Sequence, residues 1–258
     1  MKAINELWQV SKYTLMEILK SRVLINTFFI SLGIFIVVLV ASELSYGNPQ
    51  KIALDLGLGA LTLSLFIIAL LMGSTLISKE IHERTIYIVL ARGISRTNFF
   101  LGRVFGLAIA LFLNAFIITF FVLVLYFLLG GTFNALLFYS VGYSYLSSLI
   151  ILCVVSFFSL FTNITLSVIY TFILYVIGNV LNETIVLTFV ENRPILGKAI
   201  NIIRWLVPNF SILNIKDYVL YENDLTMKYL LLVGAYGVFF CIITMAISSI
   251  IFYKKDLD

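Results

Sequence analysis

The sequence predicts an all-α integral membrane protein with six transmembrane helices, an N-terminal interfacial amphipathic helix and a cytoplasmic coupling helix. Hydrophobic residues make up 62% of the chain and charged residues 12%, and the mean hydropathy is +1.10. Soluble domains carry roughly twice that charged share, about 25%. The apolar residues form long continuous runs, which is typical of spanning helices and unlike the alternation found in a membrane barrel.

Six runs approach the roughly 20 apolar residues that a spanning helix needs. They cover residues 23–41, 54–77, 105–129, 143–161, 165–181 and 229–252, and the fifth is the shortest. The sequence shows no internal repeat and no low-complexity linker between the runs. We therefore expect a single transmembrane domain over residues 1–258.

Residues 1–22 precede the first run and lack the apolar core and cleavage site of a signal peptide. We predict that they form a cytoplasmic interfacial helix. One face carries Ile4, Leu7, Trp8, Leu15, Ile18 and Leu19, and the charged residues lie elsewhere. This pattern is typical of a helix in the membrane surface. Trp8 suits the headgroup level, and Lys20 and Arg22 mark the turn into the first span. The alternative is a solvated helix packed on its own protein.

The densest charge cluster lies in residues 78–103, "SKEIHERTIYIVLARGISRTNFFLGR", between the second and third runs. Its first half predicts a short helix over 79–90, with Ser78 as its N-cap and Glu80 near its positive end. Gly93 would then turn the chain back. Such a helix, tied to two spans, would transmit force to both. The alternative is that its arginines are ordinary anchors at the cytoplasmic face.

Lysine and arginine also predict the orientation. The side predicted to be cytoplasmic carries Lys2, Lys12, Lys20, Arg22, Lys79, Arg84, Arg92, Arg96, Arg103, Lys254 and Lys255. The other side carries Lys51, Arg193, Lys198, Arg204, Lys216 and Lys228, and most of these stand in one loop that also holds five acids. The positive-inside rule therefore places both termini and the 78–103 loop in the cytoplasm, in a multi-pass protein of the cell (cytoplasmic or inner) membrane.

The long loop over residues 182–228 is predicted to be extracytoplasmic. Within "PILGKAINIIRWLVPNF", apolar residues recur at helical spacing, and Pro194 and Pro208 can begin and end a helix. A structureless loop of this length would be unusual in a compact protein. We expect one or two short amphipathic helices that lie on the membrane or dip into it; a simple surface cap is the alternative.

Several functions lose support because their residues are missing from the sequence. His82 is the only histidine, the two cysteines form no CxxC pair, and no carboxylates are paired in mid-span. The chain has no GxxxxGK[ST] phosphate loop, so we expect no ATP hydrolysis of its own. Asn114, Asn163 and Asn179 more often bridge helices than line a substrate path. An intramembrane enzyme and an ion-driven carrier are therefore disfavoured. Nucleic acid is not an expected partner either, because basic residues in a membrane protein usually set its orientation.

The charged loop resembles the signature of type-2 ABC transporter permeases. That family has a Glu-rich helix ending in Thr and an aliphatic residue, then Ile/Val-Ser-Arg, then Leu-Gly-Lys/Arg. The matching positions are Glu80, Glu83, Thr85, Ile86, Ile94, Ser95, Arg96, Leu101, Gly102 and Arg103. "LVPNFSILN" and the terminal "FYKKDLD" are similar to two further family segments, through Pro208, Asn209, Phe252, Lys254, Lys255 and Asp256. Arg84 and Gly93 depart from the family, which often has Gly and Pro there.

The resemblance implies a membrane-spanning permease subunit that binds no cofactor and is driven by a separate ATP-binding-cassette subunit, which uses ATP. A second permease copy, identical or not, would complete the translocation path, and export is the family's usual direction. The residues expected to contact the ATPase subunit are Glu80, His82, Glu83, Arg84, Thr85, Ile86 and Arg96. One alternative is a non-transporting subunit that couples ATP hydrolysis to an extracytoplasmic partner or to metal-enzyme maturation. Another is a purely structural membrane protein.

Overall fold

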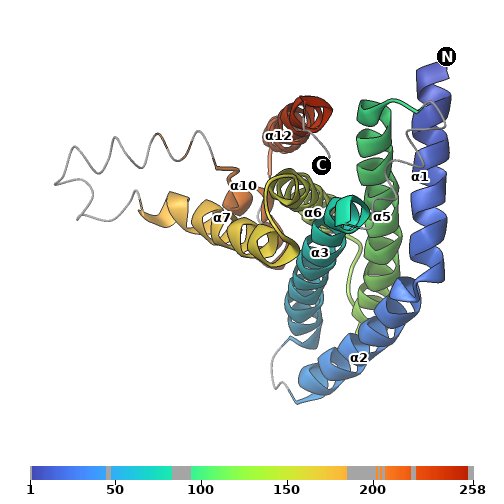
Figure 1. The fold of residues 1–258 in the computed structure, drawn as a ribbon. Coiled ribbons are helices and arrows are strands. Elements are labelled where there is room, and N and C mark those ends of the chain that lie inside the picture. Colours follow the sequence, from blue (N-terminus) through green and yellow to red (C-terminus); the bar gives the residue numbers. More distant parts are fainter. Residues whose placement is uncertain are drawn as a thin grey trace.

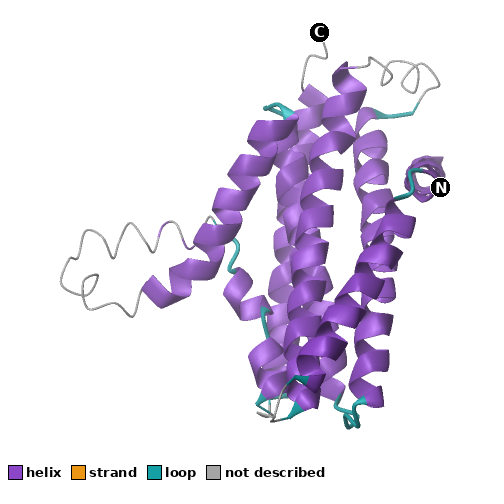
Figure 2. Ribbon diagram, turned by 90° about the horizontal axis from the view of Figure 1, so that it is seen from below, coloured by secondary structure: helices purple, strands orange, loops and turns teal. Residues whose placement is uncertain are grey.

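A computed structural model describes residues 2–44, 48–82, 94–184, 202, 204, 207–221 and 225–254, and every element in these ranges is a helix. Long helices run side by side in a bundle, and shorter ones pack at its ends and flank (Figures 1 and 2). The elements are α1 (Lys2–Lys20), α2 (Val23–Glu43), α3 (Pro49–His82), α5 (Arg96–Leu128), α6 (Ala135–Ser159), α7 (Ile164–Thr184), α10 (Phe210–Leu213), α11 (Lys216–Leu220) and α12 (Met227–Lys254).

Five of the described helices are long and apolar enough to cross a membrane: α2, α3, α5, α6 and α12. They make the chain a multi-pass membrane protein. The fifth predicted span coincides with α7, whose apolar part, Ile164–Val180, falls below the length that the other five reach. At 1.5 Å per residue such a stretch covers about 25 Å, less than the roughly 30 Å of a hydrocarbon core. Six spans therefore stay a prediction.

Two helices extend beyond their predicted runs into the charged loop. α3 has 34 residues and α5 has 33, so each is about 50 Å long and protrudes past an apolar core of about 30 Å. The backbone of residues 78–82 continues α3 without a break, so Ser78 does not begin a separate helix as the sequence predicted. The rest of that predicted helix, residues 83–90, lies outside the described residues.

The core of the bundle lies where α3 packs against α5 and α6. Leu65, Leu111 and Val155 contribute side chains that are fully buried there. Two glycines of α3 allow this close packing, because a Cβ on Gly57 would lie 2.6 Å from Val122 and one on Gly73 would overlap Val155. These glycines face neighbours within the same chain.

One predicted polar bridge between helices is confirmed. The Thr27 hydroxyl of α2 donates to the side-chain oxygen of Asn114 on α5, and both residues are buried. The amide nitrogen of Asn114 donates to the Ala110 carbonyl one turn earlier, at 2.7 Å. Asn179 makes a different contact, since its amide donates to the Tyr175 carbonyl within α7. The polar pair therefore fixes α2 against α5 in surroundings that offer few other partners.

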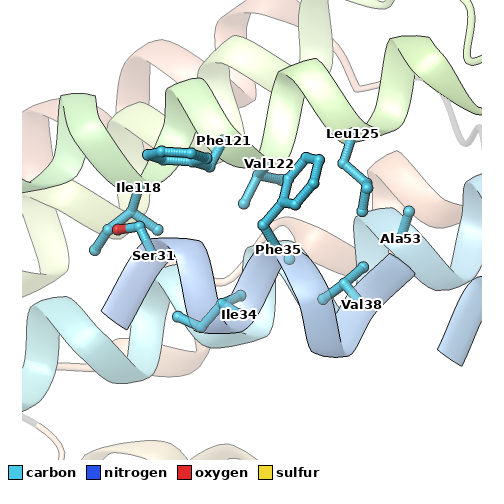
Figure 3. Close-up of a pocket in the computed structure, with 10 residues that line it drawn as sticks. Ser31, Ile34, Phe35, Val38, Ala53, Ile118, Phe121, Val122 and Leu125 are labelled. Atoms are coloured by element: carbon cyan, nitrogen blue, oxygen red, sulfur yellow. The ribbon is translucent and has the colours of Figure 1, made fainter. Parts of the chain in front are cut away.

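The seam between α2, α3 and α5 also contains a small void. Phe35 and Phe121 approach it from α2 and α5, with ring centres 6.1 Å apart (Figure 3). Its volume of about 10 Å³ is at the lower limit for a single water molecule, and apolar side chains form most of its lining. A void of this kind stays dry, so we do not regard it as a functional site.

The segment 207–221 turns back into the bundle instead of capping it. The ring of Phe210 lies 4.9 Å from that of Tyr175, midway along α7, and Tyr175 lies 4.3 Å from Phe66 of α3. The backbone N–H of Asn209 donates to the hydroxyl of Tyr236, about 14 Å into α12 at 1.5 Å per residue. α10 and α11 are short helices in this loop, and α10 dips between the long helices, but both follow Pro208. Most of the amphipathic helix predicted between Pro194 and Pro208 lies outside the described residues. Protein surrounds the irregular backbone of α10, as membrane depth requires.

Candidate functional site at the charged end of the bundle

The predicted ATPase-contact residues are only partly described. Glu80 and His82 belong, as backbone positions, to the last turn of α3, and Arg96 is the first residue of α5. The others, Glu83, Arg84, Thr85 and Ile86, lie outside the described residues. The predicted contact is flanked by the end of α3 and the start of α5, and both nevertheless lie at one end of the bundle (Figure 2).

The second flank of the predicted contact is the start of α5, which Ser95 caps. Ser95 has an extended backbone, with φ −68° and ψ 145°, and its side chain accepts from the N–H of Asn98 at 3.2 Å. A serine in this position satisfies one of the donors that the first helical turn leaves open. The "ISR" part of the motif is therefore the start of α5, so the predicted 78–103 loop is helical at both ends.

Polar contacts fasten α1 to the first turns of α5. Glu17 and Arg103 form an ion pair at 2.5 Å, and the guanidinium also lies over the ring of Phe99. Asn98 donates its amide to Glu6 at 2.9 Å, and the Ser11 hydroxyl donates to the Gly102 carbonyl at 3.0 Å. Because these contacts span both helices over several turns, α1 and the start of α5 form one packed unit.

Two glycines bring these helices close together. A Cβ on Gly102 would lie 2.8 Å from the Cβ of Val10, and one on Gly106 would lie 2.8 Å from the Ser11 carbonyl oxygen. Such distances leave no room for a side chain, so only glycine fits at this spacing. This contact was not predicted from the sequence, although "GRVFG" is a GxxxG pattern and the small residues Ser11 and Thr14 face it from α1.

The C-terminal end of α12 packs against the same region. The rings of Phe100 and Phe252 lie 5.4 Å apart, and both residues are almost fully buried. The two outermost motif segments, separated by some 150 positions in the sequence, therefore meet in space. α1 and the end of α12 both join the bundle at this end (Figure 2), which agrees with their predicted same-side placement. Which side faces the cytoplasm stays a prediction.

The five predicted membrane-interface residues lie on α1 and at its corner with α2. Trp8 and Leu19 are exposed, at 57% and 43%, whereas Leu15 is partly buried against the core. Lys20 is the exposed last residue of α1, and Arg22 is the N-cap of α2. The predicted apolar face is divided in the structure, because Ile18 is buried whereas Trp8 and Leu19 are exposed.

The opposite end of the bundle is more open. A cavity of about 580 Å³ lies there between the start of α3, the α5–α6 connection and α11. Its lining includes Asn48, Gln50, Lys51, Tyr126, Thr132, Asn134 and Val219. Beside it, Lys216 of α11 forms an ion pair with Asp55 of α3, and Gly59 leaves room for the lysine side chain. Among the described residues, no three His, Cys, Asp or Glu side chains gather as metal ligands.

Comparison with known families adds no assignment. No protein-family model matches the chain, and no curated protein matches it either. The permease resemblance therefore depends on the motif residues themselves and on where the structure places them.

Proposed function

We propose that this protein is the membrane-spanning permease subunit of an ABC exporter. A separate ATP-binding-cassette subunit binds at the charged end, and a second permease copy completes the translocation path. The supporting observation is that motif residues from distant parts of the sequence lie together at one end of the bundle. Ser95 caps α5, Gly102 and Arg103 join α5 to α1, and Phe252 packs on Phe100.

The arrangement suggests how force would pass through the protein. α3 ends and α5 begins at the proposed ATPase contact, and each helix continues through the bundle to the outer cavity. A push on the intervening segment would therefore displace both helices. Because α1 is fastened to the start of α5, it would move with that helix.

The outer end is where such a movement would have its effect. The cavity is lined by residues from α3, from the end of α5 and from the start of α6, so a relative shift of α3 and α5 would change its width. α11 is joined to α3 by the Asp55–Lys216 pair and would follow α3. ATP-driven closure of the partner subunits would in this way open the translocation path first to one side of the membrane and then to the other.

Co-purification tests the proposal. The tagged chain is extracted in mild detergent with a non-hydrolysable ATP analogue, and recovered proteins are searched for a phosphate-loop ATPase. We expect that subunit with the parent chain and a loss of at least about tenfold with Glu80→Lys plus Glu83→Lys, since like charge replaces opposite charge at the contact. Lys51→Glu, at the opposite end, is the matched control and should leave recovery unchanged.

Two results would count against the proposal. If no phosphate-loop ATPase accompanies the parent chain, a permease role is overturned. If the ATPase is recovered equally with the charge-reversed variant, the contact lies elsewhere. Stoichiometric recovery of an extracytoplasmic protein, without substrate-stimulated ATP hydrolysis after reconstitution, would favour the coupling role over export.

A further inference from the structure

The acidic and the basic residues of α1 lie on different sides of the helix. Its described acids face α5, where Glu6 accepts from Asn98 and Glu17 pairs with Arg103. Its described basic residues, Lys12 and Lys20, are exposed and belong to no ion pair within the described part of the chain. The surface that α1 turns away from the protein is therefore positively charged, although the helix as a whole is nearly balanced.

The same outward surface is apolar along its middle. Trp8, Leu15 and Leu19 follow one another at spacings of seven and four residues, which places them in one stripe along the helix. Trp8 and Leu19 are exposed, and so is Met16 at the edge of the stripe. Lys12 stands directly beside it. An indole, aliphatic side chains and flanking lysines are the composition that membrane interfaces favour.

The position of α1 matches that chemistry. It packs on residues 98–106, the first third of α5, and no charged residue follows Arg103 within that helix. Because α5 is longer than a hydrocarbon core, this third lies at the boundary where apolar surroundings begin. α1 crosses the long helices there and is seen nearly end-on in Figure 2.

The corner between α1 and α2 adds a third basic residue. Arg22 is exposed and has a φ of 62°, the only positive φ of a non-glycine residue among those described. A left-handed backbone is costly for any residue with a Cβ, so glycine would fit this corner at lower cost. An arginine at such a position adds charge next to Lys20, where the chain enters the bundle.

We infer that this surface, made of Trp8, Lys12, Leu15, Leu19, Lys20 and Arg22, binds anionic phospholipids in preference to neutral ones. The apolar stripe would enter the acyl region, and the three basic side chains would contact the headgroup phosphates. The inference is independent of the proposed transport role, because apart from Leu15, which also packs against the core, it uses residues that α1 turns away from the protein. A bound protein subunit is the competing occupant, and the experiment distinguishes the two.

Fluorescence quenching of Trp8 tests the inference in the full chain. The sequence has two tryptophans, so Trp205→Phe leaves Trp8 as the reporter. The protein is reconstituted in equal mixtures of phosphatidylcholine and phosphatidylglycerol in which only one lipid is brominated near the headgroup. We expect brominated phosphatidylglycerol to quench more strongly, with a relative affinity of at least about threefold, since each basic residue near an anionic surface contributes up to about fivefold.

The variants separate charge from apolar contact. Lys12→Gln, Lys20→Gln and Arg22→Gly together should bring the relative affinity to about one while total quenching persists, because the apolar stripe is unchanged. Lys51→Gln, an exposed lysine at the other end of the bundle, should leave the preference intact. High salt should weaken the preference as the charge changes do.

Three outcomes would overturn the inference. Equal quenching by the two lipids in the parent would exclude a preference for anionic lipid. Absence of quenching by either lipid would place Trp8 away from the membrane. Loss of quenching in the presence of a purified ATPase subunit would identify protein as the occupant. If Trp205→Phe does not fold, native mass spectrometry of the parent and of Lys12→Gln plus Lys20→Gln can compare retained phosphatidylglycerol; equal retention would again overturn it.

Discussion

The two ends of the bundle are held together in different ways. At the charged end, α1 lies against α5 through an ion pair, two hydrogen bonds and two glycines that admit no side chain. At the opposite end, α11 meets α3 through a half-exposed ion pair and a small buried cluster that includes Leu54 and Val219, beside a cavity of about 580 Å³. Packed surfaces resist displacement because they are close to crystalline in density, whereas an exposed ion pair yields easily.

This difference suggests that the two ends of the long helices have different roles in force transmission. An input end needs to be stiff so that force applied there is not absorbed by local rearrangement. An output end needs space and weak contacts so that helices can shift. The cavity provides that space at the opposite end, which supports the proposed force-transmitting role. How firmly each of these regions is held can be measured by substitution.

The largest effect is expected at the α1–α5 contact. Gly106→Ala should lower the free energy of unfolding by about 1–3 kcal/mol, because its Cβ would overlap Thr14 and the Ser11 carbonyl. Gly142→Ala is the matched control, since nothing lies within 4 Å of its Cβ, and it should be neutral or stabilising by up to about 1 kcal/mol. Thermal unfolding in detergent measures both. Equal stability of the two variants would show that α1 is held more loosely than its contacts indicate.

A smaller effect is expected where α2 meets α5. Asn114→Leu removes the buried acceptor of the Thr27 hydroxyl and should cost about 1–2 kcal/mol. The double variant with Thr27→Val should recover part of that loss, with a coupling energy of about 0.6–1.7 kcal/mol as found between membrane helices. A double-mutant cycle of unfolding free energies measures it. Strict additivity would mean that the two side chains act independently.

The sequence predicted the long helices well, because lipid requires continuous apolar segments whose backbone groups are satisfied internally. It placed their ends less well. Residues 78–82 and 96–103 are helical although they are charged, and hydropathy alone does not show where a helix ends once it has left the apolar layer. A helix that continues past the membrane is stabilised by its neighbours, as α5 is by α1.

The candidate site was predictable only in part. The amphipathic pattern correctly marked Trp8 and Leu19 as outward-facing residues, but it assigned the buried Ile18 to the same surface. α1 has two adjoining apolar surfaces, one for α5 and one facing outward, and periodicity does not separate them. The position of Phe210 inside the bundle could not be predicted either, because it depends on contacts with Tyr175 and other distant residues.

A modest stabilisation is expected at the corner between α1 and α2. Arg22→Gly should raise the free energy of unfolding by up to about 1 kcal/mol, because it relieves the left-handed backbone. Arg22→Ala is the matched control: it removes the same charge but keeps the Cβ, so it should not be stabilising. Both are compared by thermal unfolding in neutral detergent. If the two variants are equally stable, the backbone of this corner is not strained.

The smallest effect is expected at the Asp55–Lys216 ion pair, at the end of the bundle opposite the charged one. Asp55→Asn should cost no more than about 1 kcal/mol, because the Asp55 side chain is 52% exposed and water competes for both charges. Exchanging the charges, with Asp55→Lys and Lys216→Asp, should restore most of the loss at low salt and little at high salt. The measurement is again thermal unfolding, now at two salt concentrations. A loss as large as that of Gly106→Ala would mean that the opposite end is held as firmly as the charged end, and the proposed stiff input and yielding output would no longer be distinguishable.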